Sequence, residues 1–124
     1  MPSDSSSSGS GLSALAVRNS VAINTDVCRQ LAQAPFDLKN IFRTEGFDGV
    51  SRWVVRWADL CDTVLRVHAF GLMAETTRQQ ALIACNRCLA IGIPGVDALD
   101  AEVARIREVL DPYNAFPTNT LSIP

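Results

Sequence analysis

The sequence lacks the short motifs that mark most enzyme active sites. It contains no Gly-rich phosphate loop, no Gly-x-Ser-x-Gly turn and no His-Glu-x-x-His pair. His68 is the only histidine, and no acid or nucleophile stands at a spacing that would bring it to the imidazole. We therefore expect no enzymatic activity, no cofactor and no metal, and we interpret His68 as a structural residue on the inner face of a helix.

Lysine is nearly absent, since Lys39 is the only lysine among 11 basic residues and the others are arginines. The formal net charge of -2 argues against a general binder of nucleic acids or membrane surfaces. Arginine makes bidentate contacts with carboxylates and phosphates, and it tolerates partial burial. The arginines therefore remain candidates for function, although GC-rich codon usage explains their number equally well.

Long apolar runs are absent too. No stretch approaches the roughly 20 apolar residues of a membrane-spanning helix, and the Ser-rich start lacks the apolar segment of a secretory signal. Without such a signal, cysteines are expected to stay reduced. The sequence therefore predicts an intracellular protein with no membrane partner and with four free, buried thiols. These are Cys28, Cys61, Cys85 and Cys88.

The only motif-like spacing is Cys85-x-x-Cys88. A structural zinc site needs a second such pair or suitably spaced histidines, whereas Cys28, Cys61 and His68 are isolated in the sequence. A redox pair needs a preceding strand and a helix N-terminus, but this pair falls in the middle of a predicted helix. We expect both residues to be buried and unreactive.

What the sequence does contain is helical periodicity. From Val50 to Phe70 there is neither glycine nor proline, and apolar residues recur at helical spacing with charged residues on the other side. This segment is predicted to be the central helix, with Trp53 and Trp57 one turn apart on the core side. Its predicted inner face comprises Val50, Trp53, Val54, Trp57, Leu60, Cys61, Val64 and His68.

Two more principal helices are predicted after the central one. A capping-box pattern at Thr76 or Thr77 begins a helix that runs to about Ile91. Asp97 is predicted to cap a last helix, which ends before Pro112. The apolar stripe of this last helix is Leu99, Val103, Ile106 and Leu110.

The region before the central helix is predicted to be broken up. Short helices are expected over residues 12–17 and from Asn24 to the residue before Pro35, because proline disfavours the helical conformation of its predecessor. Residues 36–47 are expected to be irregular. The predicted fold is all-α, a small bundle of three principal helices plus one or two short N-terminal helices. The predicted parts are a flexible Ser/Gly-rich arm (1–11), a single helical domain (12–112) and an extended C-terminal tail (113–124).

Two sets of residues are candidates for binding. Arginines on two neighbouring helices are predicted to line a groove for RNA phosphates, namely Arg52, Arg56, Arg66 and Arg78. Asp59 and Asp62 stand among them and favour instead a solvated face held by ion pairs. Assembly or partner contacts are predicted for the apolar residues Leu12, Leu15, Leu99, Val103, Ile106 and Leu110.

Three short segments of the chain, taken in order, resemble segments of a known protein family. They are Asn-Ser-Val-Ala-Ile-Asn-Thr-Asp-Val at 19–27, Trp-Val-Val-Arg-Trp-Ala-Asp at 53–59 and Thr-Arg-Gln-Gln-Ala-Leu-Ile-Ala-Cys at 77–85. In this order, over residues 12–90, the chain resembles the coat proteins of flexuous filamentous plant viruses of the potexvirus type. The resemblance implies a filament subunit that packages single-stranded RNA. The Lys-Phe-Ala-Ala-Phe-Asp-like block that helps to form the RNA pocket of that family has no counterpart here.

Two functions are therefore predicted. The first is a structural, self-assembling helical protein, a coat or nucleocapsid subunit that packages RNA in a virion as a homo-oligomer or filament. Residues 1–24 would then bridge subunits, because arms without internal partners gain them across an interface. The alternative is a small intracellular adaptor or regulator that binds a partner protein through an amphipathic helix, with the apolar stripe of the last helix as its docking face if that stripe is exposed.

Overall fold

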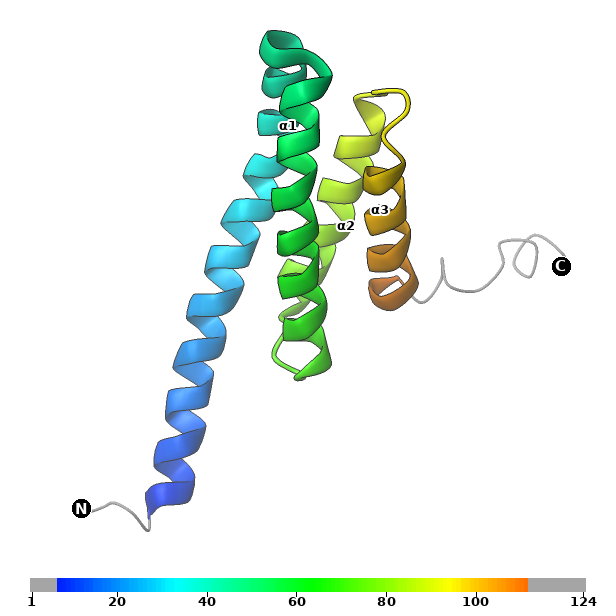
Figure 1. The fold of residues 1–124 in the computed structure, drawn as a ribbon. Coiled ribbons are helices and arrows are strands. Elements are labelled where there is room, and N and C mark those ends of the chain that lie inside the picture. Colours follow the sequence, from blue (N-terminus) through cyan, green and yellow to red (C-terminus); the bar gives the residue numbers. More distant parts are fainter. Residues whose placement is uncertain (1–6, 112–124) are drawn as a thin grey trace, which may run out of the picture.

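The computed structural model of the protein is shown in Figure 1, and it describes the backbone of residues 7–111 and the side chains of residues 18–111. Over this range the fold is all-α, as predicted, and contains no strand. The helices are α1 (Ser7–Ala69), α2 (Glu75–Ala90) and α3 (Asp97–Leu110). The predicted C-terminal tail lies outside the described residues, as does most of the predicted N-terminal arm.

Helix α1 reverses its direction at Gly46, whose φ of 69° and ψ of -152° are not helical. Only glycine adopts this region of backbone space without strain. We call residues 7–45 the first limb of α1 and residues 47–69 the second limb. In Figure 1 the first limb runs up, the second limb runs down, α2 runs up and α3 runs down. The described chain is therefore an up-and-down bundle of four helical segments.

The predicted break at Pro35 is wrong, because the first limb continues through it as one helix. Two short helices and an irregular segment over residues 36–47 are thus replaced by a single helical limb. Proline costs a helix one hydrogen bond, but here tertiary packing compensates. Pro35 is itself buried. The buried side chains on either side of it keep helical spacing, and they are Val27, Leu31, Ala34 and Leu38.

The core lies along the bundle and draws on every segment. Its largest fully buried side chains include Trp57 from the second limb, Leu31 and Leu38 from the first, and Ile106 and Leu110 from α3. Helix α2 contributes smaller residues, Ala81, Ala84, Cys85 and Cys88, each 1% exposed. The central helix and the two helices after it are therefore confirmed, and their predicted inner faces form most of the core.

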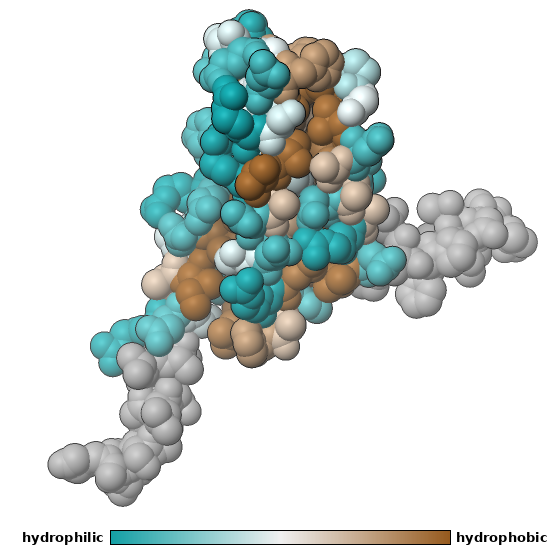
Figure 2. Space-filling view, viewed as in Figure 1, coloured by the Kyte–Doolittle hydropathy of each residue, from teal (hydrophilic) through white to brown (hydrophobic). Residues whose placement is uncertain are grey.

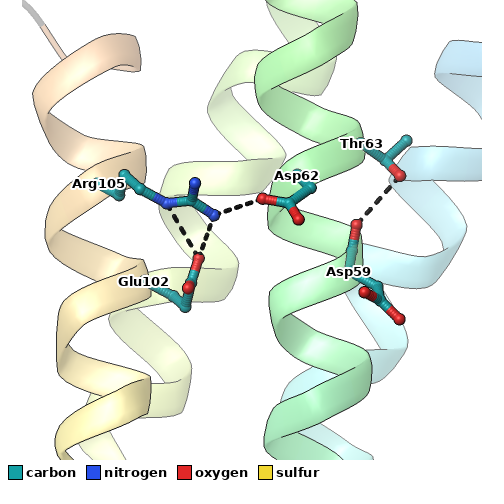
Figure 3. Close-up of polar contacts among 5 residues, drawn as sticks. All are labelled: Asp59, Asp62, Thr63, Glu102 and Arg105. Atoms are coloured by element: carbon teal, nitrogen blue, oxygen red, sulfur yellow. Dashed lines mark hydrogen bonds and ion pairs between the residues drawn. The ribbon is translucent and has the colours of Figure 1, made fainter.

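Polar contacts show which segments are neighbours. The first limb lies beside α2, because Cys28 Sγ and Thr77 Oγ1 are 3.3 Å apart. The second limb lies beside α3, where Asp62 and Arg105 form an ion pair (Figure 3). The first limb and α2 run in one direction in Figure 1, and the second limb and α3 run in the other, so each of these two pairs is parallel.

The predicted helix caps are not formed. Thr77 is fully buried in the first turn of α2 and faces Cys28, and no side chain of α2 caps its own start. Asp97 is the first residue of α3 and makes no cap bond, since the N-cap position is Val96. The start of α2 is held instead by Asn24 of the first limb, whose Oδ1 accepts a hydrogen bond from the Ala74 backbone N–H at 2.8 Å.

Candidate functional site

Three of the four candidate arginines lie on the second limb. Their spacing places Arg52, Arg56 and Arg66 on one side of that helix, together with Asp59. All three are exposed. Arg52 forms an ion pair with Glu45 across the kink, whereas Arg56 and Arg66 have no ion pair or hydrogen bond with another described residue. The three side chains form an open stripe on the surface, which we call the arginine stripe.

Arg78 has a different role from the arginine stripe. Its guanidinium donates hydrogen bonds to both carboxylate oxygens of Glu75, at 2.9 and 2.6 Å, and to the backbone oxygen of Leu110 at 2.7 Å. The bond from Arg78 is the main reason that the pKa of the Glu75 carboxyl falls to about 2. Arg78 therefore joins the start of α2 to the end of α3, and its donors are committed to these contacts.

The carboxylate of Asp62 is used between helices rather than along its own helix. Figure 3 shows Arg105 of α3 between Glu102 and Asp62, with nitrogen–oxygen distances of 2.5 Å and 2.6 Å. These two carboxylates raise the pKa of Arg105, that of Asp62 more strongly. The sequence predicted that Asp62 forms ion pairs with the arginines of its own helix, but its partner in the structure is Arg105 of α3. Such exposed pairs contribute little to stability, about 0–1 kcal/mol each.

The cysteines are free thiols, as the sequence predicts, and Cys61, Cys85 and Cys88 are buried, whereas Cys28 is only partly covered. Burial raises the pKa of Cys85 and of Cys88 to about 12, and it raises that of Cys61 further. At neutral pH these three thiols are therefore protonated and are poor nucleophiles or metal ligands. Within residues 18–111, no group of three or more His, Cys, Asp or Glu side chains is placed to hold a metal ion.

The structure corrects two predictions about which side chains are buried and which are exposed. His68 is exposed, because Val67 takes the inward position at the end of the second limb, so its predicted place on the inner face is wrong. The apolar stripe of α3 is core and offers no exposed docking face, since its four residues are at most 3% exposed. These residues are Leu99, Val103, Ile106 and Leu110. The side chains of Leu12 and Leu15, also predicted to make contacts, lie outside the described residues.

Three grooves between helices remain as candidate sites. The Trp groove lies between the two limbs of α1, has a volume of about 210 Å³, and is lined by residues that include Trp53, Arg56 and Trp57. The Phe47 groove lies between the second limb and α3 and has a volume of about 320 Å³. The Phe36 groove lies between the first limb and α2, with a similar volume of about 320 Å³. Sequence periodicity does not reveal these grooves, because each one combines residues from two helical segments.

Figure 2 shows apolar surface near the upper end of the bundle, between the second limb and α3. The Phe47 groove opens here, and Phe47 is 55% exposed. Val54 and Val96 form other parts of its wall, and Asp97 adds a carboxylate. An apolar groove with an acidic edge is suited to a helix that carries apolar side chains and a positive charge.

Comparisons with known proteins give no relative, since no family model, no curated protein and no solved structure matches the chain. Among the described residues, no helix has the length and the apolar character needed to cross a membrane.

Proposed function

We propose that the protein is a structural, self-assembling helical protein whose copies pack head to tail. In this arrangement the projecting end of α1 from one copy lies in the Phe47 groove of the next copy. The observation that carries the proposal is the length of the first limb, which extends well past the other helices in Figure 1. We call residues 7–19 the projecting segment.

The boundary of the projecting segment is set by contacts at the lower end of the bundle. Ser20 donates a hydrogen bond to the backbone oxygen of Leu72 at 3.4 Å, and Asn24 donates to the same oxygen at 2.9 Å. Residues before Ser20 therefore lie beyond the last turn of the bundle. An isolated helix of this length is marginal in water, so packing against another surface would stabilise it.

The projecting segment and the Phe47 groove are complementary in composition. The segment contains Leu12 and Leu15 at helical spacing, and Arg18 is its only charged residue. The groove offers an apolar wall with exposed Phe47 and the carboxylate of Asp97. By contrast, the Phe36 groove is lined by Lys39 and Arg87 and by no acid, so it would repel Arg18. Charge thus favours the Phe47 groove.

Because the two surfaces differ, the contact is heterologous, and every open assembly has one unused surface at each end. Such contacts build open filaments or closed rings. This agrees with the filament that the coat-protein resemblance implies, and it assigns to residues 7–19 the bridging role that the sequence predicted for residues 1–24. An adaptor that binds another protein would use the same grooves, but the chain itself supplies a matching helix.

The assembly prediction can be tested with two surface variants of the full chain. Leu15→Asp on the projecting segment and Phe47→Asp in the groove are each expected to weaken self-association at least about thirtyfold, as at interface hot spots. Sedimentation velocity over a concentration series measures this. Phe70→Asp is the matched control, because Phe70 is 71% exposed and lies outside the groove.

Mixing the variants tests the head-to-tail arrangement itself. Each variant retains one intact surface, so an equimolar mixture of Leu15→Asp and Phe47→Asp is expected to form heterodimers and nothing larger. A charge exchange gives a second readout: Arg18→Asp should weaken association, and Asp97→Arg in the same chain should restore it. A wild-type chain that stays monomeric at high concentration, or a mixture that does not associate, refutes the proposal.

RNA packaging is a separate part of the proposal and depends on the arginine stripe. Binding of a fluorescent oligouridylate is expected to weaken with salt, with a logarithmic slope near -0.7 per phosphate contacted. Arg66→Ala removes one such contact and should reduce the magnitude of that slope by about 0.7. Arg29→Ala on the first limb is the control, since Arg29 already pairs with Asp26 at 2.6 Å. Equal salt slopes for the two variants would remove Arg66 from any RNA site.

A further inference from the structure

The Trp groove contains a set of groups that the proposed assembly does not use. Its apolar part includes Trp53 and Trp57, whose rings stack with centroids 5.4 Å apart and an angle of 11° between the planes. Leu60 and Ala34 add aliphatic surface. At about 210 Å³ the groove is smaller than the pockets of drug-sized ligands, which begin near about 300 Å³. Only a small molecule fits it.

The wall of the groove includes a donor without an acceptor. Trp57 is 2% exposed, and its indole Nε1 is the one buried side-chain nitrogen or oxygen of residues 18–111 that has no hydrogen-bond partner. A buried donor left unpaired costs free energy, so native proteins usually supply an acceptor. Because less than 1 Å² of this nitrogen is accessible, a molecule in the groove contacts the ring of Trp57 and not its donor.

Opposite charges line the groove from opposite limbs. Arg56 comes from the second limb and Asp37 from the first. Asp37 accepts a hydrogen bond from Gln33 at 3.1 Å, and Arg56 has no ion pair or hydrogen bond with another described residue. No nitrogen of the Arg56 guanidinium lies within 4.0 Å of an Asp37 carboxylate oxygen, so the two charged groups stand apart from each other. The groove therefore presents a positive and a negative group with apolar surface between them.

We infer that the Trp groove binds a small zwitterion, an α-amino acid with an apolar side chain. The ligand carboxylate pairs with the Arg56 guanidinium, whose planar fork matches two carboxylate oxygens. The ligand ammonium group pairs with Asp37. Its side chain packs on Trp53 and Leu60. This inference does not depend on self-assembly.

The test uses L-leucine as the probe and the emission of the protein's own tryptophans as the readout. Trp53 and Trp57 are the only tryptophans in the chain, so occupancy of the groove is expected to shift their emission in a saturable way. N-acetyl-L-leucine lacks the ammonium charge, and L-leucinamide lacks the carboxylate. Each is expected to bind at least about tenfold more weakly, because each loses one charge-assisted contact. Glycine, which has no side chain, should also bind more weakly.

Substitutions in the groove connect each ligand charge to one residue. The Arg56→Gln variant should bind L-leucine and L-leucinamide with equal affinity, because the partner of the ligand carboxylate is gone. The Asp37→Asn variant should bind L-leucine and N-acetyl-L-leucine with equal affinity, because the partner of the ligand ammonium group is gone. Arg66→Gln and Asp48→Asn are the matched controls, since both residues are exposed and lie outside the groove.

Calorimetric titration of the full chain provides a second measurement. Saturable binding of L-leucine that follows this pattern of analogues and variants supports the site. The inference is overturned if millimolar L-leucine produces neither heat nor an emission shift. It is also overturned if Arg56→Gln and Asp37→Asn bind all three compounds as the wild-type protein does.

Discussion

Replacing Gly46 by valine is expected to lower the free energy of unfolding by roughly 2–3 kcal/mol. The reversal of α1 depends on this residue, because its φ of 69° and ψ of -152° suit glycine alone. Space is not the obstacle, since a Cβ atom at Gly46 would meet nothing within 4 Å. The whole cost therefore comes from the backbone. A β-branched side chain makes this conformation still less accessible.

Urea unfolding followed by circular dichroism at 222 nm measures this loss. Thr44→Val is the matched control, because Thr44 is exposed two residues earlier in the regular helix, and its effect should stay within about 0.5 kcal/mol. A valine variant as stable as the control would show that the reversal does not need the glycine conformation. Gly49→Ala differs in mechanism, since its Cβ would lie 2.5 Å from Ile41 Cγ2 and crowd the two limbs.

The sequence predicted well those helices in which the periodic apolar run ends close to a residue that terminates helices. The central helix, α2 and α3 combine an unbroken periodic run with a glycine or proline close to at least one end. In the first limb these two signals conflict. Proline at position 35 predicts an end, whereas the spacing of Val27, Leu31 and Leu38 predicts continuation. Burial of that face outweighed the loss of one backbone hydrogen bond.

The candidate sites were harder to predict, because each depends on residues from different helices. The Trp groove joins Asp37 to Arg56, and no local pattern connects these positions. The predicted inner face of the central helix failed only at its last position. There the helix turns Val67 inward and His68 outward. Val67 and His68 stand three and four residues after Val64, and helical spacing allows either of them on the inner face, so packing decides.

The abundance of arginine has a structural explanation in part. Arg78, Arg105 and Arg107 each bond to a second helix, at Leu110, Asp62 and Asn86 respectively. A planar guanidinium suits such bridges, because it donates in several directions at once. These contacts leave Arg56 and Arg66 as the members of the arginine stripe without partners among the described residues. Arg56 and Arg66 are the arginines to which the proposals above assign ligands.

Replacing Asn24 by alanine is expected to lower the free energy of unfolding by about 2 kcal/mol. Asn24 is 8% exposed. Its Oδ1 accepts from the Ala74 N–H at 2.8 Å, and its Nδ2 donates to the Leu72 oxygen at 2.9 Å and to the Ser20 oxygen at 2.7 Å. Alanine leaves the Ala74 donor unpaired at the start of α2, where no side chain of α2 replaces it. The turn that connects the second limb to α2 then loses its main attachment to the first limb.

Asn40→Ala on the same limb is the control. Asn40 is exposed, and its side chain accepts only from Arg43, at 3.0 Å, so its loss should change stability by at most about 0.5 kcal/mol. Asn24→Asp keeps an acceptor for Ala74 but loses the donor to Leu72, and it should fall between the two alanine variants. Urea unfolding ranks the three variants, and hydrogen exchange of the Ala74 amide locates the effect. If Asn24→Ala and Asn40→Ala unfold at the same urea concentration, the attachment through Asn24 does not stabilise the bundle, and the other contacts of α2 are enough to position it.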